Sequence, residues 1–145
     1  MKHINLLSFV QAQGDLNPEL FKKLMNNHRL DITSNKKIKS QEIEGIKNLT
    51  YMILKTNNNI SILNNYFLNY TIPQIGKEFD LLRIGDNYIV NIEIKSESTN
   101  YKIIKQQERN RYYLSFLNKE IHIYTYITTD NKLSGLPKFN SLLFR

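Results

Sequence analysis

Cysteine is absent from the 145-residue chain, and this absence excludes several classes of protein. A disulfide scaffold, a thiolate metal site and a cysteine nucleophile all need a thiol, so a metal site would use oxygen ligands and a hard cation. No apolar run approaches the ~20 residues that a membrane-spanning helix needs. The opening residues 1–5 do not resemble a secretory signal. We therefore expect a cytoplasmic protein with no membrane partner.

Internal boundaries are lacking as well. No repeat, linker, low-complexity block or charged tail divides the sequence, and its length is within the usual size of one domain. We expect a single domain over 1–145. It would consist of an N-terminal helical extension (1–39), a core (40–128) and a C-terminal extension (129–145).

Positive charge is in excess, since 20 Lys and Arg stand against 13 Asp and Glu and give a net charge of +7. The chain is also rich in Asn (19), Ile (19) and Lys (15), a bias typical of AT-rich genomes. Codon usage alone would supply much of the lysine. The charge therefore indicates a nucleic-acid partner only where it lies beside a site.

Apolar periodicity predicts an α/β (α+β) fold with a mixed sheet flanked by helices. Helix start signals stand at Asn17–Glu19 and at Ser40. The expected elements, in order, are a helix reaching about His28, a helix over 41–55, a strand within 60–72, strands over 78–84 and 88–96, a helix over 101–118 and a strand over 120–128.

Glu42 is the unusual residue of the helix over 41–55. At 100° per residue it lies about 40° from Ile46, inside the apolar stripe of that helix. A carboxylate on the core side is costly unless something pairs with it. An acid in the first turn is favourable at the positive end of a helix, and both interpretations stay open.

The hairpin between the two central strands brings acidic side chains together. A two-residue loop at Asp86–Asn87 pairs positions whose numbers sum to 173, which places Asp80 opposite Glu93. Opposed residues have Cβ atoms about 5 Å apart. Lys95 lies two residues beyond Glu93 and shares its face, so Asp80, Glu93 and Lys95 are expected on one side of the sheet.

Two facing carboxylates repel unless a cation or a proton lies between them. Mg²⁺ binds one or two carboxylates together with water and phosphate oxygens, and a lysine beside it would orient or deprotonate a bound water. The alternative is a solvated strand face with cross-strand Glu–Lys pairs. A second Asp-x-Lys pattern at 130–132 has no acidic strand before it and is interpreted as surface.

These residues resemble the PD-(D/E)xK nuclease superfamily, which includes many restriction endonucleases and archaeal Holliday-junction resolvases. The resemblance covers about 40–128 and rests on 78–82, on Glu93-Ile94-Lys95 and on the helix that follows. The element order matches the restriction-endonuclease-like αβββαβ core of that superfamily. Phe79 stands where the motif usually has proline.

The resemblance implies a role for each matching residue. Asp80 and Glu93 would bind Mg²⁺ with the Ile94 carbonyl, Mn²⁺ would substitute for it, and Lys95 would serve the attacking water. Glu42 matches an acid that many members place on the first core helix. The helix over 101–118 matches a glutamine of several branches, with Gln107 as first choice and Gln106 as second. Because position 111 is Arg, the Gln-x-x-x-Tyr spacing of the RecB-type branch is missing.

Basic residues gather on that same helix and give a net charge of +4 over 101–119. They would contact phosphates and position a duplex without reading bases. An ordinary solvated helix face is the alternative. The candidate nucleic-acid contacts are Lys102, Lys105, Arg109 and Arg111.

The resemblance therefore predicts a metal-dependent nuclease that hydrolyses phosphodiester bonds in DNA, with RNA as an open alternative. Its setting would be repair, recombination or defence in a prokaryote, phage or mobile element. The chain would act alone, as a homodimer or as a module of a larger protein. Two other functions stay open: a nucleic-acid-binding module that retains the nuclease fold without cutting, and a structural protein whose charged strand face is only solvated.

Overall fold

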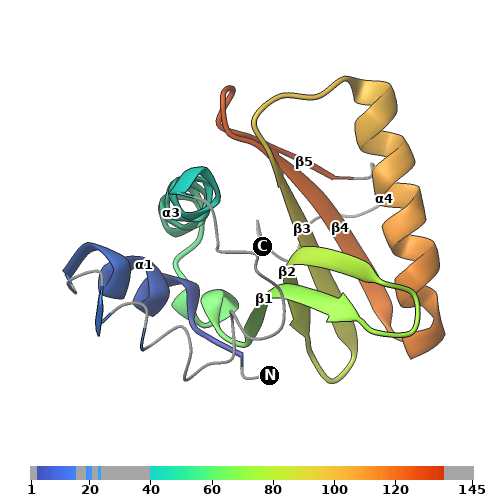
Figure 1. The fold of residues 1–145 in the computed structure, drawn as a ribbon, viewed down its shortest axis with the longest axis horizontal. Helices are drawn as coiled ribbons and strands as arrows, with labels where there is room; N and C mark the ends of the chain where they lie inside the picture. Colours follow the sequence, from blue (N-terminus) through green and yellow to red (C-terminus); the bar gives the residue numbers. More distant parts are fainter. Residues whose placement is uncertain (1–2, 16–18, 21–22, 24–39, 136–145) are drawn as a thin grey trace.

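A five-stranded mixed sheet organises the fold, with its strands in the order β1-β2-β3-β4-β5 (Figure 1). The computed structural model describes residues 3–15, 19–20, 23 and 40–135. The β3 and β4 strands pair in parallel, and the other neighbours are antiparallel. The strands are β1 (Tyr66–Ile72), β2 (Lys77–Ile84), β3 (Tyr88–Lys95), β4 (Glu120–Ile127) and β5 (Lys132–Gly135).

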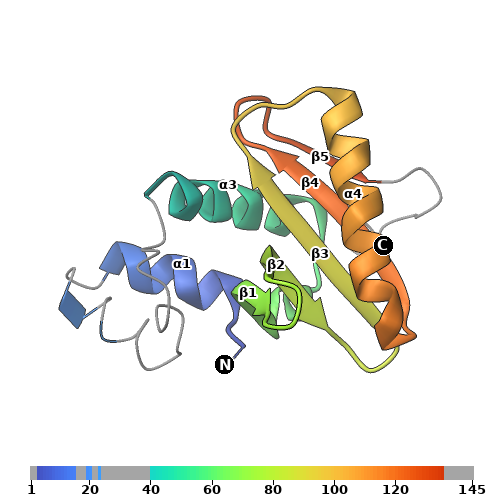
Figure 2. The same cartoon turned by 45° about the vertical axis from the view of Figure 1, so that its right-hand side comes forward.

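Helices cover both faces of this sheet. As Figures 1 and 2 show, α1 and α3 lie on one side, whereas α4 lies on the other and provides the crossover between β3 and β4. The helices are α1 (Leu6–Asp15), α3 (Ser40–Thr56) and α4 (Asn100–Leu114), and the 3₁₀ turns are η1 (Ile60–Leu63) and η2 (Ser115–Leu117). Among the described residues, no helix is long and apolar enough to cross a membrane.

Each face of the sheet buries its own core. The α3-side core joins α1, α3 and the sheet through Leu6, Phe9, Val10, Ile46, Leu49, Ile53, Leu63, Tyr66, Leu68, Leu81, Val90, Ile92, Tyr124 and Tyr126. The α4-side core contains Ile72, Phe79, Leu82, Ile89, Leu114, Ile121 and Ile123. Burial of apolar surface on both faces explains why the central strands are so rich in isoleucine and leucine.

The predicted fold class, a mixed sheet flanked by helices, is confirmed at this level. Two elements were not predicted, namely α1 and the four-residue β5. The α1 helix begins after Asn5, whose side chain accepts a hydrogen bond from the Ser8 amide at 2.9 Å as a helix cap does. The predicted helix from Asn17 to about His28 lies mostly outside the described residues.

The hairpin register is the predicted one. Paired positions of β2 and β3 sum to 173 from Ile84↔Ile89 to Leu81↔Ile92. The Gly85 amide donates to the Tyr88 carbonyl at 2.8 Å and closes the two-residue loop. This register brings the Asp80 and Glu93 positions to the same level of the sheet.

The alternation of side chains between the two sides of the sheet is interrupted at Asn69 in β1 and at Asp80 in β2. Alternate residues of a regular strand share a face. Leu68 nevertheless belongs to the α3-side core, whereas Tyr70 packs against the α4-side core. Across the ribbon, Leu81 and Phe79 divide in the same way. Asn69, between the two halves of β1, has a φ of 50°, a left-handed conformation that asparagine tolerates better than most residues.

Candidate active site

Asp80 lies at the point where the backbone pairing between β2 and β3 ends. Hydrogen-bonded pairs recur at every second position from Gly85–Tyr88, so a continued ladder would join the Ile94 amide to the Phe79 carbonyl. Instead, Oδ2 of Asp80 accepts that hydrogen bond from Ile94 at 2.9 Å. The side chain of Asp80 thus replaces a backbone acceptor, and its carboxylate is fixed at the opening between the strands.

Glu93 lies beneath α4 and is 3% exposed. Its Oε1 accepts hydrogen bonds from Nδ2 of Asn91 at 3.1 Å and from Nδ2 of Asn110 at 3.0 Å. The two asparagines also bind each other, since Nδ2 of Asn110 donates to Oδ1 of Asn91 at 2.9 Å. Asn91 is anchored to β2 through the Leu81 carbonyl at 3.1 Å. We call Asn91 and Asn110 the asparagine clamp.

The pKa of Glu93 is raised from its ordinary range to about 7, first by burial and then by the neighbouring carboxyl group of Asp80, which acts through repulsion and a side-chain hydrogen bond. The hydrogen bond from Asn91 and the positive charge of Lys77 act in the opposite direction. Glu93 therefore holds its proton until the pH approaches neutrality. A divalent cation would relieve the same repulsion by replacing that proton.

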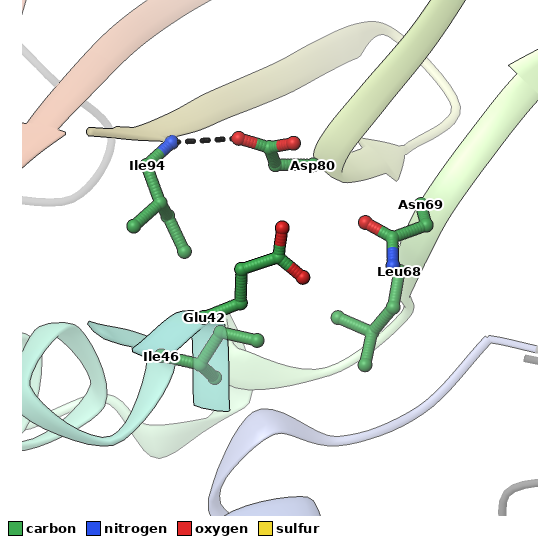
Figure 3. Close-up of a pocket in the computed structure, with 6 residues that line it drawn as sticks. All are labelled: Glu42, Ile46, Leu68, Asn69, Asp80 and Ile94. Carbon is green, nitrogen blue, oxygen red and sulfur yellow. Dashed lines mark hydrogen bonds between the residues drawn. The ribbon is translucent and has the colours of Figure 1, made fainter. Parts of the chain in front are cut away.

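A small pocket lies on the α3 side of Asp80. In Figure 3 the Glu42 carboxylate points from α3 toward Asp80, and the amide oxygen of Asn69 faces the same space. Glu42 is in the first turn of α3 and also lines the pocket, so both interpretations of this residue describe its position. The lining residues are Glu42, Ile46, Leu68, Asn69, Asp80 and Ile94.

One expectation about faces needs correction. Asp80 was expected on the same side of the sheet as Glu93 and Lys95, and Glu93 lies on the α4 side. Because the alternation is interrupted at Asn69, Asp80 instead lines the α3-side pocket while its carboxyl group still contacts Glu93. Asp80 is therefore the residue that joins Glu42 on one side of the sheet to Glu93 on the other.

Lys95 is half-buried at the end of β3, opposite Ile127 of β4. Within the part of the chain that the structure describes, its ammonium group forms no ion pair or hydrogen bond with Asp80 or Glu93. The structure thus brings Asp80 next to Glu93 and, across the pocket, next to Glu42, with Lys95 two positions along the strand from Glu93. The Lys95 side chain would have to turn toward the carboxylates to act with them.

Gln107, the first choice for the glutamine of the resemblance, faces the sheet and is 2% exposed. Its Nε2 donates to Oγ1 of Thr125 at 3.2 Å and to the Ser134 carbonyl at 3.0 Å. Gln107 therefore ties α4 to β4 and β5, whereas Asn110, one turn later, bonds to Glu93. Gln106, the second choice, is half-buried and forms no hydrogen bond with the site among residues 40–135.

The asparagine clamp was missed by the sequence interpretation, although a signal for it existed. Asn110 lies on the sheet-facing side of α4, and Asn91 precedes Glu93 by two positions on the same strand. Amides on two facing elements beside a buried acid are candidate donors to that acid. Periodicity indicates which polar residues of α4 face the sheet. It does not indicate which of them, Gln107 or Asn110, reaches Glu93.

The four predicted nucleic-acid contacts lie on two different sides of α4. Lys102, Lys105 and Arg109 are exposed on the side away from the sheet. Arg111 is half-buried, and burial lowers the pKa of its guanidinium group. Three of the four predicted residues therefore form one basic outer face, and Arg111 lies apart from them.

The residues present suit a hard cation in part. In the described portion of the chain, no group of three or more histidine, aspartate or glutamate side chains surrounds one point. A cation would be held by two carboxylates, completed by a backbone carbonyl, water and phosphate oxygens, which is the usual manner of Mg²⁺. The pair of carboxyl groups formed by half-buried Asp80 and buried Glu93 fits this donor set.

No protein-family model, curated protein or solved structure matches the chain. Its function is therefore inferred from the residues of the site itself.

Proposed function

We propose that this chain is a Mg²⁺-dependent nuclease of the PD-(D/E)xK type, with Mn²⁺ as a substitute, that hydrolyses phosphodiester bonds in DNA. The observation that carries the proposal is the Asp80–Glu93 pair at the opening between β2 and β3. Two carboxyl groups are fixed there by independent hydrogen bonds, and burial and mutual repulsion raise the pKa of one of them to about 7. The order α3, β1, β2, β3, α4, β4 supports a restriction-endonuclease-like core.

Each site residue has a defined part in this proposal. Asp80, Glu93 and the Ile94 carbonyl would hold the cation, which when bound supplies a Lewis acid for the attacking water and the scissile phosphate. Glu42 borders the same space from α3 and would accept a proton from water there. Lys95 would turn toward the carboxylates and place positive charge beside the phosphate. Gln107 would keep α4 seated on β4 and β5.

A cleavage assay on the full chain tests the proposal. Linear, branched and single-stranded DNA would be incubated with Mg²⁺, Mn²⁺ or EDTA, using the wild type, Asp80→Asn and Lys95→Ala. We expect cleavage only with a divalent cation and a loss of at least about 100-fold in each variant, since each removes a group that stabilises the transition state. Cleavage in EDTA, or full activity of Asp80→Asn, would contradict the proposal.

A matched control is available in the same chain. Asp130 and Lys132 repeat the acid-x-lysine pattern at an exposed turn leading into β5. Asp130→Asn and Lys132→Ala change the same charges without touching the site, so both should cut at the wild-type rate. An equal loss in these variants would show that net charge, and not the carboxylate pair, determines the rate.

A non-catalytic nucleic-acid-binding module is the second candidate. It is favoured by the burial of Glu93 beneath α4 and by the position of Lys95 outside the hydrogen bonds of the site. This candidate predicts that DNA binds but is never cut under any of the metal conditions. It also predicts that Lys95→Ala binds DNA as the wild type does.

A further inference from the structure

Three aromatic rings project into solvent from α4 and the turn that follows it. Tyr101 is 72% exposed, Tyr112 75% and Phe116 67%. Residues that lie three or four apart, or a sum of such steps, share a helix face, so Tyr101 and Tyr112 project from one exposed face of α4, and exposed Phe116 follows in η2. The α4 helix itself covers one side of the sheet (Figure 2). Aromatic side chains are enriched at contact surfaces, and several exposed on one face are more informative than single ones.

Three exposed basic side chains lie between Tyr101 and Tyr112 along the helix. Lys102, Lys105 and Arg109 are exposed, and Nζ of Lys105 lies 5.8 Å from the centre of the Tyr101 ring. Glu108 is the single acid between 100 and 116. We call this surface the α4 outer face; it consists of Tyr101, Lys102, Lys105, Arg109, Tyr112 and Phe116.

The chemistry of the α4 outer face selects its partner. A second copy of the chain would bring like charges together if the face packed on itself, which opposes association. A nucleic-acid strand carries the opposite charge at regular intervals. In a duplex the bases stack on one another, whereas an unpaired strand offers free base faces to aromatic side chains. Rings and cations on one surface therefore favour an unpaired strand over a duplex.

We infer that the α4 outer face binds an unpaired nucleic-acid strand. Bases stack on Tyr101, Tyr112 and Phe116, and Lys102, Lys105 and Arg109 contact the phosphates. The face extends for roughly 20 Å at 1.5 Å per residue, long enough for several nucleotides. The assignment of this strand to the substrate rests on the proposed function, because the first turn of α4 follows the strand that carries Glu93 and Lys95.

Binding to the full chain in EDTA tests the inference without any cleavage. Fluorescence anisotropy would measure affinity for labelled oligo(dT) and for a duplex of equal length, with wild type, Tyr101→Ala/Tyr112→Ala and Tyr112→Phe. We expect oligo(dT) to bind more tightly than the duplex. Loss of the two rings should weaken oligo(dT) binding by at least about 10-fold, since one stacked base contributes roughly 5- to 150-fold. Tyr112→Phe, which keeps a ring, should bind as the wild type does.

Tyr51→Ala is the matched control, because this tyrosine is 42% exposed on α3 and should leave oligo(dT) binding unchanged. Wild-type affinity in the Tyr101→Ala/Tyr112→Ala variant, or equal affinity for duplex and single strand, would overturn the inference. So would a dimer that Tyr112→Ala dissociates, because the face would then belong to a second copy. Because this assay measures binding and not cleavage, it tests the inference even if the chain is not a nuclease.

Discussion

The buried Glu93 carboxyl group should make the stability of the fold depend on pH. Its pKa is about 7 in the folded protein, above the ordinary value near 4.5 that it regains on unfolding. Below pH 4.5 the group is protonated in both states and contributes no penalty. As the pH rises from 4.5 to 7, the unfolded chain releases the proton while the folded protein still holds it. The free energy of unfolding therefore falls across this window and is level above it.

The size of the effect follows from the shift. One pKa unit corresponds to about 1.4 kcal/mol, so ionised Glu93 costs the fold about 3 kcal/mol above pH 7. Glu93→Gln removes this cost, because an amide stays neutral at every pH and its carbonyl still accepts from the asparagine clamp. Near pH 4.5 the variant and the wild type should have the same free energy of unfolding. At pH 8 the free energy of unfolding of the variant should be larger by about 3 kcal/mol, which corresponds to a melting temperature roughly 6–12 °C higher for a chain of this length.

Urea unfolding at pH 4.5, 6, 7 and 8 in EDTA would measure this difference. Glu97→Gln, at an exposed glutamate just after β3, serves as the control and should follow the wild type at every pH. A wild-type curve that stays parallel to Glu93→Gln from pH 4.5 to 8 would refute the reasoning. Mg²⁺ at about 100 times its Kd should restore about 2.7 kcal/mol to the wild type at pH 8, and less to Glu93→Gln.

Three further substitutions examine the supports of the site. Asn110→Ala removes one of the two amide donors to Glu93; we expect a loss of about 1–3 kcal/mol in unfolding free energy and a pH midpoint for the Glu93 step that moves upward. Gln107→Ala should destabilise by a similar amount but leave that midpoint unchanged, because its bonds run to β4 and β5. Gly45→Ala places a Cβ 2.9 Å from a methyl group of β3 and should destabilise by about 1–2 kcal/mol in thermal melts. The control Gly14→Ala meets nothing within 4 Å and should be neutral or stabilising.

The hairpin register was predictable because a two-residue turn leaves little freedom. Once Asp86 and Asn87 form the loop, every pair from Ile84↔Ile89 to Leu81↔Ile92 follows by counting. The order of the main helices and strands followed from apolar periodicity for the same reason, since spacing along the chain carries that information. Both predictions are local in sequence, and both are confirmed.

The direction of Asp80 was not predictable in this way. It depends on the positive φ of Asn69, which lies across the ribbon and which the residue type permits without requiring. Counting alternate residues assigns Leu82, Asp80 and Glu78 to one face of the sheet. It cannot detect that an irregular residue in the neighbouring strand interrupts this alternation. The contact from Asn110 to Glu93 depends in turn on the packing of α4 across the sheet. That packing brings together residues far apart in sequence.

The two carboxylates are held by different elements, and this separation matters for any reaction at the site. Asp80 is fixed by the Ile94 amide of β3, whereas Glu93 is fixed by the asparagine clamp, which includes α4. Because neither group relies on the other for its orientation, a proton between them can be lost or replaced by a cation without loss of these hydrogen bonds. A continuous β2–β3 ladder would pair the Ile94 amide with a backbone carbonyl and leave Asp80 without its anchor. The departure of β2 at Asp80 therefore fixes two neighbouring acids in the arrangement that the proposed cation site requires.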